Sequence, residues 1–139
     1  MELNNFTKFK IDTGYLKKLA EKVLKGEPSF AKATEGKGKK IDLSISLVSP
    51  EEIRKLNKKY RKTDKSTDVL SFTYQDSGEI VLCPRVIKEN AKKYGENFKK
   101  ELARVLVHGI LHTLGYNHEK GAKEAEKMRK KEEYYIKLT

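Results

Sequence analysis

All three histidines of this chain, His108, His112 and His118, lie in one short stretch, His-Gly-Ile-Leu-His-Thr-Leu-Gly-Tyr-Asn-His. His108 and His112 are four residues apart in a segment with helical apolar spacing, which places both rings on one helix face. Gly115 can end that helix in a left-handed conformation, so that the chain folds back and brings His118 to the same point. Three neutral imidazoles with an open fourth position are typical of catalytic zinc, which lowers the pKa of bound water to about 7. The sequence therefore predicts one zinc ion per chain.

Two alternatives to a catalytic zinc site follow from the same stretch. The histidines can share a helix by chance, although buried imidazoles without partners would be costly. The spacing also resembles the extended zinc signature of the metzincin peptidases, but Gly109 stands where those enzymes have a catalytic Glu after the first His. Because that Glu is the general base, its absence makes a peptidase the least favoured activity.

Length and composition indicate a single domain over residues 1–139. No apolar run approaches the roughly 20 residues that span a bilayer, and residues 1–10 lack the apolar region of a signal peptide. The only cysteine, Cys83, excludes an internal disulfide and favours a reducing cytoplasm. We therefore expect a cytoplasmic protein that does not act in a membrane.

The chain is strongly basic, with 31 Lys and Arg against 20 Asp and Glu and a formal net charge of +11. This charge predicts a polyanionic partner, of which nucleic acid is the commonest. A solvated lysine-rich surface is the alternative. Next to a hydrolytic metal site, the charge favours a phosphodiester substrate.

The apolar patterns predict an α+β fold, a small four-stranded mixed sheet packed with about five helices. Alternation predicts strands over residues 6–11, 41–48, 69–74 and 79–82, the last two joined by a tight turn at 75–78. Helices are expected from Thr13 to Gly26, from Pro50 to about Tyr60, after Pro84, after Asn97, and from about Ala122 to Lys137. The helix after Asn97 is apolar on nearly all sides, so it is the buried central helix, and it carries His108 and His112. Residues 26–40 are polar and Gly-rich and predict a flexible surface connection.

Two blocks of the sequence carry a resemblance to a known family. The first contains Asn57, Tyr60-Arg61 and Thr67-Asp68-Val69-Leu70-Ser71-Phe72, and the second runs from His108 to His118. In both blocks, and in Gly78-Glu79-Ile80-Val81 and Met128, the chain resembles the YbeY family of bacterial rRNA-maturation endoribonucleases, whose three-His site sits on a zincin-like scaffold. Asn117 stands where that family has an Asp, and Thr63 and Ser66 replace a usual Lys and Pro.

The resemblance implies a zinc-dependent, single-strand-preferring endoribonuclease acting in ribosomal RNA maturation and ribosome quality control. In that interpretation His108, His112 and His118 hold zinc, and Arg61 grips the scissile phosphate through planar bidentate donors. The implied partners are ribosomal RNA precursors and a ribosomal subunit or its proteins, with the oligomeric state left open. The alternative is a non-catalytic, metal-stabilised module that binds the ribosome or RNA. The absence of a Glu after His108 and the presence of Asn117 leave this alternative open.

Some residues near Arg61 admit two interpretations. Lys58, Lys59, Lys62 and Lys65 form a basic run that contacts RNA phosphates or is simply a solvated face. Tyr60 and Tyr116 are equally consistent with core packing and with base stacking. Val69, Leu70 and Phe72 are expected to be packing residues of a strand.

Overall fold

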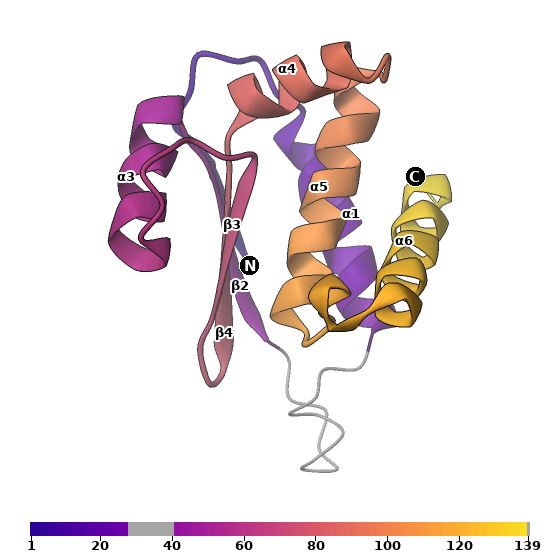
Figure 1. Ribbon diagram of the computed structural model, residues 1–139. Coiled ribbons are helices and arrows are strands. Elements are labelled where there is room, and N and C mark those ends of the chain that lie inside the picture. The colour runs from indigo at the N-terminus through magenta and orange to yellow at the C-terminus, as the bar shows by residue number, and fades with distance from the viewer. Residues whose placement is uncertain (28–40, 139) are drawn as a thin grey trace.

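The computed structural model describes residues 1–27 and 41–138, except for the side chain of His118, and shows a sheet with helices on both faces (Figure 1). The sheet contains β1 (Glu2–Asn5), β2 (Asp42–Leu47), β3 (Val69–Thr73) and β4 (Ser77–Leu82). The helices are α1 (Thr13–Gly26), α3 (Pro50–Arg61), α4 (Pro84–Lys93), α5 (Phe98–Thr113) and α6 (Ala122–Lys137), with a short 3-10 turn, η1 (His118–Lys120). The predicted α+β class with a four-stranded mixed sheet and five helices is thus confirmed.

The strands are ordered β1-β2-β4-β3. β1, β2 and β4 run parallel, and β3 pairs antiparallel with β4, so β3 is an edge strand. One face of the sheet is covered by α1 and α5, with α6 packed outside them, and the other face by α3 (Figure 1). α5 has buried residues along its whole length, as the apolar sequence predicts, because it lies between the sheet, α1, α4 and α6.

The predicted N-terminal strand over residues 6–11 is wrong, because β1 lies earlier, at Glu2–Asn5. The side chain of Asn5 explains where the strand ends. Its Oδ1 accepts hydrogen bonds from Thr7 N and Oγ1, at 2.9 and 2.7 Å, and its Nδ2 donates to Phe9 O at 2.9 Å. These bonds between side chain and backbone compete with strand pairing and bend the chain. The apolar alternation after Asn5 therefore belongs to a bend.

Two further boundaries differ from the sequence prediction. The turn between β3 and β4 is shorter than the predicted residues 75–78, because Ser77 and Gly78 already belong to β4. Tyr74 N closes the turn by donating to Ser77 O at 2.8 Å. The predicted connection over residues 26–40 starts too early, because Gly26 is helical and Glu27 is buried. Residues 28–40 of that prediction lie outside the described residues. In the described part of the chain, no helix is long and apolar enough to cross a membrane.

Candidate active site

His108 and His112 lie one turn apart on the same face of α5, as their spacing predicts. Their ring centroids are 5.7 Å apart and the rings are inclined at 63°. Both side chains open onto a cleft of about 840 Å³ between α5 and the edge strand β3. Polar groups of the cleft also come from α3 and from the turn after α5. The lining residues include Arg61, Thr67, Asp68, Ser71, Thr73, Arg104 and Glu119.

Glu132 of α6 fixes the orientation of the His108 ring. Its Oε2 lies 2.8 Å from His108 Nδ1, and only 5% of Glu132 is exposed. With Glu132 accepting as a carboxylate, Nδ1 is the donor of this hydrogen bond, which leaves Nε2 as the ring nitrogen available to a metal. A carboxylate behind a histidine is the usual support of a metal-binding imidazole.

A second ionic contact holds Glu132 in place. Its Oε1 lies 3.6 Å from Arg104 Nη1, while Arg104 also donates two hydrogen bonds of 2.8 Å to the carboxylate of Glu101. These hydrogen bonds to Glu101, together with the charges of Glu132 and Asp68, raise the pKa of Arg104 despite its partial burial. Arg104 therefore remains charged and ties the cleft to α6.

The sequence analysis did not assign Glu132 to the site. Its partner His108 is 24 residues away, and no local pattern predicts that pairing. The available signal was a carboxylate on the helix face that also carries the buried Met128 and Tyr135. A buried charge at such a position needs a partner.

Gly109, the residue after the first histidine, packs closely against the sheet. A Cβ at this position would lie 3.3 Å from a methyl group of Ile80 and 3.3 Å from one of Val69. A larger residue here would therefore require small shifts of β3, β4 or α5. As the sequence shows, this position carries no general base of the metzincin kind.

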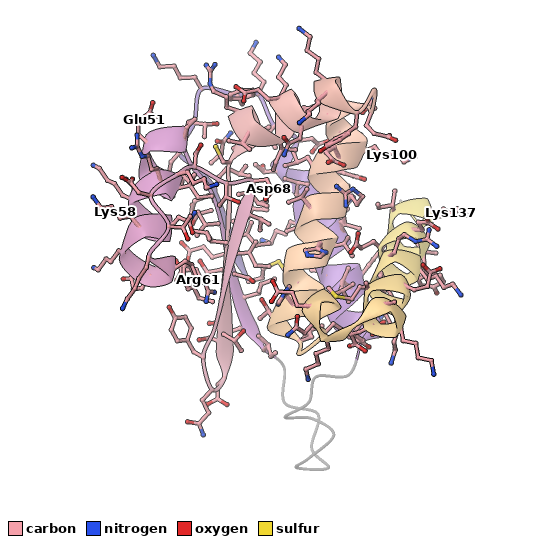
Figure 2. The ribbon with its side chains drawn as sticks, in the orientation of Figure 1. Glu51, Lys58, Arg61, Asp68, Lys100 and Lys137 are labelled. Atoms are coloured by element: carbon pink, nitrogen blue, oxygen red, sulfur yellow. The ribbon has the colours of Figure 1, made fainter. Side chains whose placement is uncertain are left out.

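Arg61 reaches the same cleft from the other side of the sheet edge. It is the last residue of α3, and Figure 2 shows it beside β3. Its Nη2 donates to Ser71 O at 2.7 Å, and its guanidinium carbon lies 5.2 Å from the centre of the Phe72 ring. The structure thus brings Arg61, His108 and His112 together around one cavity, although 47 residues of sequence separate Arg61 from His108.

The backbone of the third histidine follows α5 through a tight helix ending. Gly115 has φ 106°, Gly115 N donates to His112 O, and Tyr116 N donates to Leu111 O, both at 3.0 Å. This pair of bonds is the Schellman motif, which the glycine makes possible. His118 then begins η1, and its side chain lies outside the described residues. Among the side chains that the structure does describe, no three His, Cys, Asp or Glu residues form a metal-binding group.

A comparison with known protein families identifies the family to which the chain belongs. The family model described as "Endoribonuclease YbeY" matches residues 2–139. The chain belongs to the YbeY family. The α5 histidine stretch and the Arg61 block both lie within the matched residues.

Several YbeY proteins align with about two thirds of the chain. The endoribonuclease YbeY of Thermotoga neapolitana is 43% identical over 98 residues, which cover 69% of this chain and 66% of that protein. The Aquifex aeolicus protein is 42% identical over 103 residues, 69% of each chain. These matches span about two thirds of the relatives' length. The solution structure of TM1509 from Thermotoga maritima has 34% identity and a TM-score of 0.69, covering 98% of this chain and 87% of that one.

Asn117, where the resemblance leads us to expect an Asp, is the N-cap of η1. Its Oδ1 accepts a hydrogen bond from Glu119 N at 2.9 Å and caps η1. A cap needs a side-chain oxygen that accepts, and Asn supplies it as well as Asp does. Compared with the expected Asp, Asn117 carries no negative charge beside the backbone of His118 and can make the same cap.

The residues around Arg61 divide between exposed and packed positions. Tyr60 is 54% exposed and contacts the Phe72 ring edge-on at 5.3 Å, so it is a surface aromatic. Leu70 and Phe72 pack under α3, as expected. The basic run at Lys58, Lys59, Lys62 and Lys65 is exposed, and Lys58 points away from the cleft on the outer side of α3 (Figure 2).

Proposed function

We propose that this protein is a zinc-dependent endoribonuclease that binds one zinc ion through His108, His112 and His118. The observation that carries the proposal is the convergence of His108, His112 and Arg61 on one cleft in a chain of the YbeY family. Two imidazoles on one helix face suit a borderline-soft ion such as zinc. Glu132 adds the oriented carboxylate that such a ligand requires.

The chain's own residues have separable parts in the reaction. A zinc ion held there would supply Lewis-acid chemistry, activating water near neutral pH and offsetting charge on the phosphate. Arg61 binds the scissile phosphate, for which it exchanges its contact with Ser71 O for phosphate oxygens. Glu132 keeps the proton on His108 Nδ1, so that Nε2 faces the cleft. The net charge of +11 attracts the RNA backbone.

The biological setting of the proposal is the maturation of ribosomal RNA precursors and ribosome quality control in the cytoplasm. The relatives' name, endoribonuclease YbeY, supports RNA as the substrate. The single thiol fits a reducing compartment. Cys83 is buried, and burial raises its pKa, so it stays a protonated packing group. A ribosomal subunit or its proteins are the proposed partners.

The test compares zinc content and cleavage of structured and single-stranded RNA for the wild type and His112→Ala. The wild type should hold about one zinc by the ligand count, lose cleavage on chelation and regain it with added zinc. His112→Ala should lose both zinc and cleavage, while Lys17→Ala, an exposed change on α1, should keep both. Cleavage that persists in His112→Ala would reject the catalytic site. Metal and RNA binding without any cleavage would favour the RNA-binding module instead.

A further inference from the structure

Glu27 is a buried carboxylate at the end of α1, next to the turn that follows α5. Only 7% of the residue is exposed. Its oxygens accept hydrogen bonds from the hydroxyls of Tyr116, at 2.7 Å, and Tyr135, and lie 3.1 Å from Lys131 Nζ. We call Glu27, Tyr116, Lys131 and Tyr135 the Glu27 cluster. It joins three segments that lie far apart in the sequence: the end of α1, the turn after α5, and α6.

Three contacts fix the position of Tyr116, one to its backbone, one to its ring and one to its hydroxyl. Its backbone N–H donates to Leu111 O in the helix ending. Its ring lies under two ammonium groups, with Lys127 Nζ at 5.6 Å and Lys131 Nζ at 5.5 Å from the ring centre. Its hydroxyl is anchored by Glu27. Since Tyr116 comes two residues before His118, the position of its ring constrains where the backbone of His118 begins η1.

Burying the charges of the Glu27 cluster costs desolvation free energy, which apolar packing between the helices would not cost. A buried ion pair is often no more stabilising than apolar residues of the same volume, but its hydrogen bonds fix one geometry. Burial alone would raise the pKa of Glu27, yet the hydrogen bonds from Tyr135, Tyr116 and Lys131 lower it below its usual value. Glu27 therefore stays ionised and keeps accepting from both hydroxyls. None of the four residues lines the cleft, so the cluster acts on the site through the segments that it holds: the turn that leads to His118, and α6, which carries Glu132.

We propose that the Glu27 cluster positions the turn at Tyr116 so that His118 meets the metal together with His108 and His112. This inference rests on the proposed zinc site. Tyr116 and Glu27 are positioning residues, and they set metal affinity rather than touch substrate. Outer groups that orient metal ligands typically change metal affinity by about 10- to 100-fold when removed.

The chain supplies a matched pair of variants for the test. Tyr116→Phe and Tyr135→Phe each delete one hydroxyl from the same carboxylate, but only Tyr116 belongs to the turn. Zinc dissociation constants, measured by chelator competition, should rise about tenfold or more in Tyr116→Phe. They should rise less in Tyr135→Phe, whose hydroxyl holds Glu27 but does not belong to the turn. Thermal unfolding of both metal-free variants shows whether they lose comparable stability.

A second variant acts from the other side of the hydrogen bond. Glu27→Gln leaves one carbonyl oxygen for two hydroxyls, so it should also weaken zinc binding. Equal zinc affinity in Tyr116→Phe and Tyr135→Phe would overturn the proposal and leave the cluster a structural support only. Zinc binding by the wild type with no change in Tyr116→Phe or Glu27→Gln rejects the cluster's role but not the zinc site. A wild type that binds no zinc, or whose affinity equals that of His112→Ala, overturns both.

Discussion

At His108 the contact with Glu132 orients the ring. With Glu132 accepting as a carboxylate, Nδ1 donates and Nε2 is the nitrogen available to a metal. The same carboxylate contacts Arg104, so its charge is balanced although it is buried. The chemistry of the cleft thus depends on a residue that does not line it.

Glu132→Gln should weaken zinc binding by roughly tenfold or more, because it removes the negative charge that supports the imidazole. Glu133→Gln is the matched control. Glu133 is the next residue on α6, exposed, and paired with Arg129 at 2.8 Å. Chelator competition on both variants measures the difference. If the two zinc affinities agree, the Glu132 carboxylate does not tune the ligand.

Arg61→Lys should keep the positive charge but lose the planar fork of donors. We expect RNA affinity near the wild-type value and single-turnover cleavage lowered on the order of tenfold or more. RNA affinity at two salt concentrations, measured beside cleavage, separates binding from turnover. Lys58→Ala, on the outer side of α3, should leave cleavage near the wild-type rate. Unchanged cleavage in Arg61→Lys would remove Arg61 from the reaction.

Among the elements, α5 must approach the sheet closely to carry the histidines to the edge strand. Small residues make this approach possible at two levels of the interface. Gly109 of α5 faces Ile80 and Val69, and Gly78 of β4 faces the side chain of Thr113. The register of α5 against the sheet is therefore set by glycines on both sides.

Gly78→Ala should destabilise the protein by about 1–3 kcal/mol, because the new Cβ would overlap the Cγ2 methyl of Thr113. Adding Thr113→Ser removes that methyl and keeps the hydroxyl, which donates to Gly109 O at 3.0 Å, so the double variant should recover stability. Gly14→Ala, which meets only Asp12 Oδ1 at 3.5 Å, is the control for a tolerated Cβ. Urea unfolding gives the free energies. If the double variant does not recover the free energy of unfolding, the contact between the new Cβ and Thr113 is not the cause of the destabilisation.

The elements that the sequence predicted well are those whose signals are local. The helix at His108 and His112 follows from apolar spacing, and its ending follows from Gly115, whose φ is 106°. The site residues that the sequence missed take part in distant contacts: Glu132 pairs across 24 residues, and Glu27 across 89 residues to Tyr116. The misplaced first strand has another cause. Alternation cannot reveal that the side chain of Asn5 ends the strand by bonding the backbone ahead of it.

For the whole molecule, buried carboxylates connect the helices that surround the cleft. Glu132 connects α6 to α5, and Glu27 connects the end of α1 to α6 and to the turn after α5. These groups lie inside a protein whose net charge is +11. Protonation of Glu27 at low pH adds to this positive charge and weakens the hydrogen bonds that the carboxylate accepts from Tyr116 and Tyr135.

Acid stability is the measurable consequence at this scale. The pKa of Glu27 is lower in the folded protein than its ordinary value, since hydrogen bonds outweigh burial. Its contribution is therefore complete above the unfolded value, about pH 4.3, and is lost as the pH falls through the lower folded value. One such group gives a slope of at most about 1.4 kcal/mol per pH unit. Glu27→Gln should flatten the fall in unfolding free energy below about pH 4.3 by up to this amount.

The control for the acid experiment is Glu21→Gln, an exposed change on α1, and urea unfolding between about pH 3 and 7 covers the window. The fall in unfolding free energy at alkaline pH, which we call the alkaline limb, tests the same cluster through Tyr135. Burial and the contact with Glu27 raise the pKa of Tyr135, so its contribution persists up to about pH 10 and is lost as the pH rises further. Tyr135→Phe has no proton to lose and should flatten that limb. Parallel curves for the wild type and Glu27→Gln in acid would mean that Glu27 is not the ionised centre of its cluster.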